Sequence, residues 1–312
     1  MWVYAMTQAG ANSVTRRFLR AIVVVALLEA TAVGTAKYSR ADPCGHEAFS
    51  RCKSTLAELA APSGRPSGIL GPKDRREPNA SGQWPWSSIG RVNLVFGPSH
   101  RGLCTGTLTG ARQVVTAAHC LFNTRVNDWA KPHMVHFVVG QAGEKTFGHS
   151  MVASFVVSPD FKFRVEDRPR YDVVPTGMIR HDWAILTLRD AMDLKPIPIR
   201  SMQNGELPTP GRAQEVALAG YGVDRQFVLS VHRGCSAKIG TPDAGSITHM
   251  CDSMPGQSGG PILLLQDGNA SLFGILSGTS QRLQAQVGYQ AIAGLGVSAS
   301  EFEQAAADAK QP

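Results

Sequence analysis

One serine of the chain is placed among glycines in a pattern that suggests chemistry. Residues 251–261 read CDSMPGQSGGP, so Gly256, Gly259 and Gly260 surround Ser258. Glycine reaches backbone conformations closed to other residues and lets a substrate approach the main chain. The pattern therefore fits an exposed turn that presents a nucleophilic hydroxyl, and it fits a plain structural turn equally well.

A serine hydroxyl is a poor nucleophile near neutral pH, so Ser258 needs a base, and the base needs a group that orients it. TAAHC (116–120) places His119 at the end of a strand-like run, and HDWAIL (181–186) places Asp182 before an almost wholly apolar one. Each has a more ordinary explanation when taken singly. A lone histidine is usually a surface or core residue, and an aspartate before a strand is usually a turn residue.

We expect His119, Asp182 and Ser258 to be positioned by short β-rich runs that are separated by turn residues. The first group is VNLVF (92–96), CTGTLTG (104–110), RQVVTAA (112–118), HMVHFVVG (133–140), SMVASFVVS (150–158) and DWAILTL (182–188). The second group is QEVALAGYG (214–222), HRGCSAKI (232–239), PILLL (261–265), SLFGILSG (271–278) and VGYQAIAG (287–294). Many short strands without interleaved long helices predict an all-β sandwich or barrel, with one short C-terminal helix in residues 298–310.

The N-terminal region is predicted to be an export signal followed by a propeptide or linker. TRRFLR (15–20), the apolar AIVVVALL (21–28) and the small residues GTA (34–36) make residues 1–36 a signal peptide. The apolar run is too short for stable membrane insertion. Arg16 and Arg17 also resemble a twin-arginine signal, so the export route stays open. Residues 37–82 are rich in Ala, Pro, Gly, Ser and charges, which predicts a secreted or periplasmic zymogen.

The cysteines form three couples along the chain. An oxidising compartment favours disulfides over free buried cysteines. Fifteen pairings are possible in principle, and the pairing of sequence neighbours is the one we expect. Each such loop contributes roughly 3 kcal/mol in a chain-entropy estimate. The expected bridges are Cys44–Cys52, Cys104–Cys120 and Cys235–Cys251.

Composition argues against several other classes of protein. The 312 residues are 43% hydrophobic and 18% charged, which is typical of a globular domain. The formal charge is +7, but Lys and Arg are scattered, so we expect no nucleic-acid partner. The chain has no C-x-x-C, phosphate-binding loop or H-E-x-x-H, and the histidines of HMVH (133–136) would face opposite sides of a strand. We therefore expect no cofactor, no metal, and a monomer.

The order His119, Asp182, Ser258, with TAAHC, DWAIL and GQSGGP around them, resembles the trypsin and chymotrypsin family of serine proteases. The resemblance covers roughly residues 83–305 and is closer to the bacterial branch, which includes the glutamyl endopeptidases. It implies two six-stranded antiparallel β-barrels, about 83–195 and 212–297, with a cleft between them. Residues 306–312 would form a C-terminal tail.

The resemblance also implies roles for individual residues. His119 would take the proton of the Ser258 hydroxyl and later give it to the leaving amine, while Asp182 would hold the imidazole. The backbone N–H groups of Gly256 and Ser258 would form the oxyanion hole. Ser277, in GILSG, matches a serine that supports the buried aspartate.

Substrate preference stays open at this stage. Asp252 lies six residues before Ser258, where trypsin-like members place the carboxylate that binds a substrate Arg or Lys. An equally good explanation is that Asp252 is a loop residue, which bacterial relatives with other substrate preferences share. Ser277, Gly278 and Thr279 are the other expected substrate-binding residues, with Thr279 narrowing the pocket entrance.

Two departures from the family pattern bear on activation and specificity. Gln257 stands where animal digestive enzymes have an aspartate that receives the new amino terminus, and a neutral amide cannot form that ion pair. ILGP (69–72) faintly resembles such a terminus, and we interpret it as coincidence. Leu276 stands where glutamyl endopeptidases usually have a histidine, which argues against a Glu preference.

The sequence thus predicts an exported serine endopeptidase that acts on proteins or peptides through an acyl-enzyme, with Arg or Lys as the preference that Asp252 suggests. The alternative is a catalytically weak or silent homologue that acts as a binding protein. A third hypothesis is a narrow processing enzyme whose insertion at 159–180 restricts access to the cleft.

Overall fold

The computed structural model describes residues 68–79, 82–97, 100–123, 126–162, 174, 176–203, 206–208, 214–241, 243–284 and 288–309. All of them belong to one compact unit, Lys53–Pro312. The predicted signal peptide, the Cys44–Cys52 bridge and much of the predicted propeptide lie outside the described residues.

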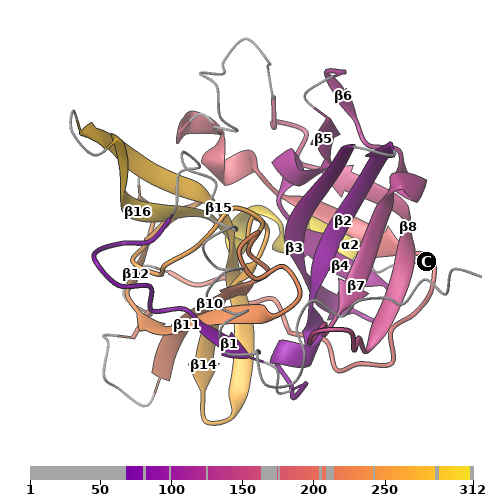
Figure 1. Ribbon diagram of the computed structural model, residues 1–312, viewed down its shortest axis with the longest axis horizontal. Helices are drawn as coiled ribbons and strands as arrows, with labels where there is room; N and C mark the ends of the chain where they lie inside the picture. Colours follow the sequence, from indigo (N-terminus) through magenta and orange to yellow (C-terminus); the bar gives the residue numbers. More distant parts are fainter. Residues whose placement is uncertain are drawn as a thin grey trace, which may run out of the picture. The chain divides into compact units, whose positions relative to one another are not determined.

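Six antiparallel strands close into a barrel in the order β2-β3-β4-β9-β8-β7, in the half of the unit that carries the labels β2, β3, β4, β7 and β8 in Figure 1. Their burial follows the two-residue period of a strand that faces a core on one side. In β7, for example, Val135, Phe137 and Val139 are fully buried and the residues between them are half-buried. The strands are β2 (Ile89–Gly97), β3 (His100–Gly110), β4 (Gln113–Thr116), β7 (Val135–Val139), β8 (Gly148–Val157) and β9 (Ala184–Leu188).

A second antiparallel sheet follows in the order β1-β11-β10-β14-β15-β16-β13-β12. Its strands are β1 (Glu77–Asn79), β10 (Gln214–Gly220), β11 (Leu229–Cys235), β12 (Ala237–Ile239), β13 (Ser246–His249), β14 (Pro261–Gln266), β15 (Asn269–Gln284) and β16 (Gly288–Ser298). The predicted all-β, double-barrel class is confirmed, although this sheet has eight strands among the described residues rather than the six predicted.

The extra strand β1 comes from the region predicted to be a propeptide or linker. Its residues pair with β11, in the register Glu77↔Val231. In Figure 1 the same segment is the dark purple trace that leads into β1. No strand was predicted here, because a three-residue edge strand pairs through its backbone and needs no alternation of side chains. Residues 68–79 are therefore part of the fold, which starts before the predicted boundary at residue 83.

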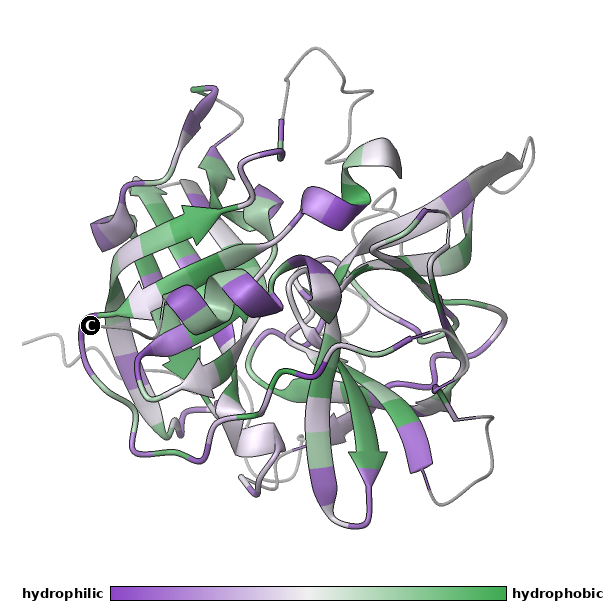
Figure 2. Ribbon diagram, turned by 180° about the vertical axis from the view of Figure 1, so that it is seen from behind, coloured by the Kyte–Doolittle hydropathy of each residue, from purple (hydrophilic) through white to green (hydrophobic). Residues whose placement is uncertain are grey.

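The core consists of three clusters of buried apolar residues, and Figure 2 shows hydrophobic residues in green along the strands of both sheets. One cluster fills the closed barrel and another lies within the second sheet. A third combines Val115 and Ile185 of the barrel with Leu263 of the second sheet and Phe302 near the C-terminus. Since burial of apolar area is the dominant stabilising term, this shared cluster fixes the two sheets relative to each other.

The remaining described elements are short. They are the strands β5 (Phe122–Asn123) and β6 (Asp128–Trp129), the 3₁₀ turns η1 (Trp86–Ser88), η2 (Ala118–Leu121), η3 (Pro132–Met134), η5 (Thr176–His181) and η6 (Ala299–Glu301), and the helix α2 (Glu303–Asp308). Helix α2 accounts for the predicted C-terminal helix. Among the residues with a described structure, no helix combines the length and apolarity needed to cross a membrane.

Candidate active site

His119 is positioned by the turn η2, which directly follows strand β4. Its backbone N–H donates to Asp182 Oδ1 at 2.8 Å, and its Nδ1 lies 2.7 Å from Asp182 Oδ2. The carboxylate accepts a hydrogen bond from the Nδ1–H, which assigns the neutral ring the tautomer whose Nε2 can act as a base. The side chain is 16% exposed, so the ring is held by the barrel and still reaches the surface.

Asp182 is a fully buried carboxylate between the turn η5 and strand β9. Besides the two donors of His119, it accepts a hydrogen bond from Ser277 Oγ at 2.6 Å. Ser277 belongs to β15 of the second sheet, so this bond links the two sheets. A buried charge is costly unless it is hydrogen-bonded, and these three donors offset that cost.

Two disulfides brace the loops around these residues, and both were predicted. Cys104–Cys120 joins β3 to η2 beside His119, and Cys235–Cys251 joins β11 to the loop that carries Ser258. The two sulfur atoms of the first bridge also lie within 4.8 Å of His119. Because a disulfide has no thiolate to offer, these three residues do not form a zinc site of the usual kind.

The turn around Ser258 requires its glycines for both conformation and space. Gly256 and Gly259 have φ of +97° and +76°, in the left-handed region that other residues rarely adopt. A Cβ on Gly259 would lie 2.2 Å from Thr116 Oγ1. A Cβ on Gly260 would lie 2.4 Å from Ala219 O. The three glycines thus allow a tight turn against the barrel, as the sequence suggested.

The backbone of this turn leaves two amides available. The N–H groups of Gln257, Gly259 and Gly260 donate to Met254 O, Leu276 O and Gln257 O at 3.0, 2.7 and 2.8 Å. Within the described part of the chain, the N–H groups of Gly256 and Ser258 have no hydrogen-bond acceptor. Ser258 itself is half-buried. Two neighbouring unpaired amides beside a hydroxyl are what an oxyanion site needs.

Gln257 is fully buried and is bound by its own chain. Its Oε1 accepts from the Met254 N–H at 2.8 Å and from Arg76 Nη1 at 3.3 Å. Its Nε2 donates to Gly220 O at 3.2 Å and to Ser230 O at 3.4 Å. A neutral amide with Arg76 beside it therefore fixes the turn at the position where the digestive enzymes of the family have an acidic residue.

Asp252 is also fully buried, and its side chain contacts Arg75. Its oxygens accept hydrogen bonds from Arg75 and from the Leu70 N–H. Burial by itself would raise the pKa of this carboxyl, but the hydrogen bonds from Arg75 and Leu70 hold the pKa below its ordinary value. Neither Arg75 nor Arg76 was predicted as a site residue, because both stand in a charged stretch with little periodicity.

Of the other predicted pocket residues, Thr279 lies beside Ser253. Thr279 Oγ1 is 3.5 Å from Ser253 Oγ. Gly68 and Ser253 exchange two backbone hydrogen bonds of 3.1 Å each, and a Cβ on Gly68 would meet both hydroxyls. Gly278 pairs with Leu295 of β16. The segment that begins at Gly68 is thus packed directly against the residues expected to line the substrate pocket.

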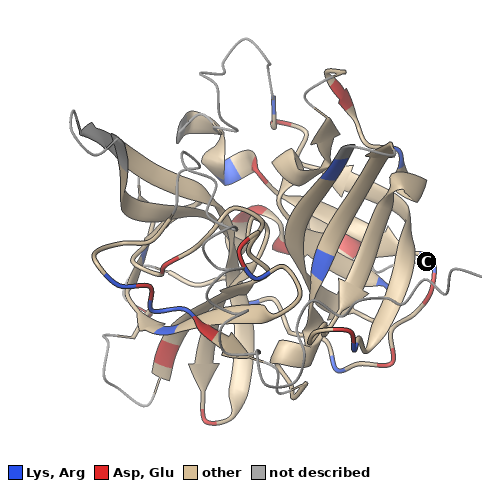
Figure 3. Ribbon diagram, viewed as in Figure 1, with Lys and Arg blue, Asp and Glu red and all other residues tan. Residues whose placement is uncertain are grey.

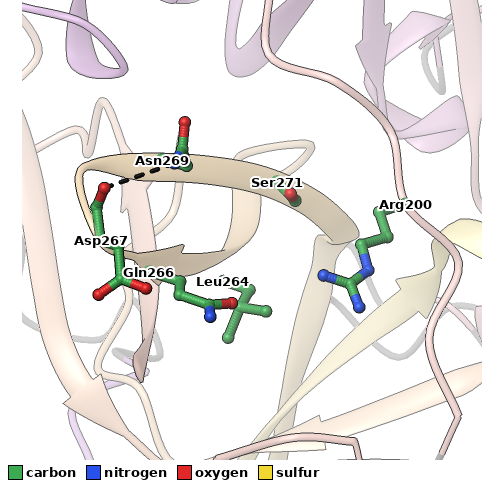
Figure 4. A pocket seen from close by; sticks show the side chains of 6 residues that line it. All are labelled: Arg200, Leu264, Gln266, Asp267, Asn269 and Ser271. Atoms are coloured by element: carbon green, nitrogen blue, oxygen red, sulfur yellow. Dashed lines mark hydrogen bonds between the residues drawn. The ribbon is translucent and has the colours of Figure 1, made fainter. Parts of the chain in front are cut away.

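A shallow depression of about 290 Å³ lies elsewhere, on the hairpin of β14 and β15 (Figure 4). Its walls are polar and open to solvent, and none of the residues discussed above takes part. It is lined by Arg200, Leu264, Gln266, Asp267, Asn269 and Ser271. Nothing in its lining resembles a reactive site.

Comparison with known proteins gives a consistent picture. The family model described as "Trypsin-like peptidase domain" matches residues 104–275, which is more than half of the chain. The proclotting enzyme of Tachypleus tridentatus is 25% identical over 63% of this chain and 56% of its own length. Serine protease 23 of Rattus norvegicus is 30% identical over 56% of this chain and 48% of its own length. The chain thus spans about half the length of these two relatives.

Solved structures show the same fold at low sequence identity. A Glu endopeptidase determined with MPD has a TM-score of 0.56 and 18% identity, over 77% of this chain and 99% of its own. The Vibrio cholerae VesB protease has a TM-score of 0.52 and 16% identity, over 76% of this chain and 67% of its own. At these identities the likeness concerns the fold alone.

Proposed function

The chain belongs to the trypsin-like peptidase family, and from that premise we propose that it is a serine endopeptidase of proteins or peptides. The observation that carries this proposal is the buried Asp182, which holds His119 by two contacts and is itself held by Ser277. An imidazole fixed in this way has one nitrogen committed to the carboxylate and the other suited to proton transfer.

In the proposed reaction, Ser258 Oγ attacks the carbonyl carbon of the scissile peptide bond while its proton passes to His119 Nε2. The tetrahedral intermediate then collapses, the C–N bond breaks, and His119 gives the proton to the leaving amine. Water repeats the sequence on the acyl-enzyme and releases the carboxylic acid. Asp182 stabilises the imidazolium that forms in each half of the reaction.

The Gly256 and Ser258 amides are proposed to bind the oxyanion of both tetrahedral intermediates. Their lack of other acceptors in the described chain and the fixed geometry of the turn support this role. One such donor is typically worth about 10² to 10³ in rate. The need for a φ of +97° at position 256 then has a catalytic reason, since it orients an amide toward the developing charge.

We also propose that the enzyme is exported and made as a zymogen. Because residues 68–79 are part of the fold, the segment removed on activation would lie before Gly68. The two described disulfides support an oxidising location. A preference for Arg or Lys substrates is the specificity suggested by the position of Asp252, and it requires a carboxylate that a substrate cation can reach. In the structure this carboxylate is bound by Arg75.

Covalent labelling with a fluorophosphonate probe tests the proposed nucleophile. The purified protein and its Ser258→Ala variant are treated in parallel, and the modified peptide is identified by mass spectrometry. We expect labelling at Ser258 that disappears in the variant. If folded, processed protein takes no label and cleaves no peptide, the enzyme proposal fails and the alternative of a binding protein gains support.

A further inference from the structure

Asp252 has its hydrogen-bonding capacity filled by its own chain. Oδ1 accepts from the Leu70 N–H and from Arg75 Nη2, both at 2.8 Å. Oδ2 accepts from the Arg75 N–H at 2.9 Å and from Arg75 Nε at 3.0 Å. An ionised carboxylate offers about four acceptor positions, and this one has no solvent exposure. A substrate guanidinium or ammonium would find no acceptor left on it.

Arg75 is held firmly in this position. Its Nη2 donates also to Leu70 O at 3.1 Å and to Met250 O at 3.3 Å. The two donors to opposite carboxylate oxygens make the bidentate geometry for which arginine is well suited. The hydrogen bond to Asp252 raises the pKa of Arg75, so the guanidinium stays charged and the two charges offset each other.

The segment that carries Arg75 is anchored at both of its ends. Gly68 is hydrogen-bonded to Ser253 at one end, and β1 pairs with β11 at the other. Between them, the buried Arg76 binds Asp74 at 2.8 Å and Asp224 at 2.7 Å. Figure 3 shows the alternation of basic and acidic residues along this stretch. The Arg75–Asp252 pair is thus part of the folded framework and differs from a loose surface ion pair.

We propose that Arg75 is a specificity-determining residue, which binds Asp252 in the place of a substrate cation so that the enzyme prefers an uncharged side chain to Arg or Lys before the cleaved bond. The proposal rests on the proposed peptidase function. A substrate cation would have to displace Arg75 or to approach it as a like charge, and either is unfavourable. An uncharged side chain meets neither penalty.

The test is a series of peptides that differ only in the residue before the cleaved bond, with Arg, Lys, Gln or Leu at that position. We expect kcat/KM of the wild type to be at least about tenfold higher for Gln and Leu than for Arg and Lys. In Arg75→Ala, the ratio of Arg or Lys to Gln should rise about 10- to 100-fold, because the carboxylate then has acceptors for a cation. The control is Arg233→Ala, which removes an exposed arginine of strand β11. This variant should leave the ratio unchanged.

A second variant keeps the proposal testable if Arg75→Ala does not fold. Asp252→Asn retains the shape of the side chain and leaves no uncompensated buried charge. We expect its ratio of Arg to Gln cleavage to stay within about threefold of the wild type, since the carboxylate does not bind substrate. A wild type that prefers Arg or Lys and loses the preference in Asp252→Asn would overturn the proposal.

The same experiment separates this proposal from the proposed function. Cleavage of the Gln or Leu peptide, together with fluorophosphonate labelling, shows that the peptidase is active whatever its specificity. An active enzyme whose ratio does not change in folded Arg75→Ala contradicts the specificity proposal alone. Folded protein that neither takes the probe nor cleaves any of the four peptides contradicts both.

Discussion

Asp182 and Asp252 are two buried carboxylates, one in the loop before β9 of the barrel and one in the loop that leads to Ser258. Both have no solvent exposure, and both are surrounded by hydrogen-bond donors. They differ in the partner: Asp182 binds His119, whereas Asp252 binds Arg75. Histidine changes its charge near neutral pH and arginine does not. The first pair can therefore assist proton transfer, and the second can only supply a fixed, balanced charge.

The largest effect expected from this contrast is the fall in kcat of the Asp182→Asn variant. The amide cannot orient the imidazole in the tautomer that has a basic Nε2, and we expect kcat to fall about 10⁴-fold, as it does for this change in a member of the family. Steady-state kinetics on an uncharged peptide measures it. Asp190→Asn, an exposed aspartate of the same barrel, is the control. A loss below tenfold would break the contrast between the two carboxylates.

The Asp252 pair should instead show its effect in stability. Arg75→Ala leaves a buried carboxylate without its cation, and we expect a loss of about 3 kcal/mol in the free energy of unfolding. Asp252→Asn should cost less, about 1 to 2 kcal/mol, because the half-exposed Arg75 can be hydrated. Urea unfolding at neutral pH gives both values. Equal losses, or a larger loss for Asp252→Asn, would contradict this account.

Acid sensitivity between pH 6.5 and 4 should come from His249, a fully buried side chain of β13. Burial lowers the pKa of His249 to about 4, whereas an unfolded histidine titrates near 6.5. The unfolded state then binds the extra proton first, so stability is complete above pH 6.5 and falls as the pH drops toward 4. The expected loss is roughly 3 kcal/mol.

Urea unfolding of the wild type and of His249→Asn across this range tests the assignment. The asparagine does not titrate and keeps an acceptor for the Cys251 N–H, which His249 Nδ1 accepts at 3.2 Å. The variant should therefore show a nearly flat profile between pH 6.5 and 4. If its stability falls as steeply as that of the wild type, another group, such as the buried His232, is responsible.

The smallest effect concerns Arg76, which reaches Gln257 while Arg75 reaches Asp252. Loss of the hydrogen bond from Arg76 Nη1 to Gln257 Oε1 should loosen the turn that presents the Gly256 amide. We expect kcat to fall about tenfold in Arg76→Gln, with KM little changed. Partial recovery in Arg76→Lys would support a positioning role. An equal change in KM, or unchanged kcat with lower stability, would indicate a purely structural role.

Much of the fold and of the candidate site could be predicted because the signals are local. Short β-rich runs between turn residues indicated the strands, and the glycines around Ser258 indicated a turn that the structure shows to need them. The pairing Cys104–Cys120 and Cys235–Cys251 followed from cysteines close in the sequence. His119, Asp182 and Ser277 were predicted through family motifs, and the structure places their side chains in one hydrogen-bonded chain.

The sequence by itself thus determined the all-β class, the family and the residues to consider for chemistry. The partner of Asp252 was decided by tertiary structure alone. Arg75 and Asp252 are 177 positions apart, and a short edge strand in a charged stretch has no period that would announce it. Long-range ion pairs depend on how chain segments pack in space. A carboxylate at the position that binds substrate in trypsin-like members can therefore be paired with a cation from a distant part of its own chain.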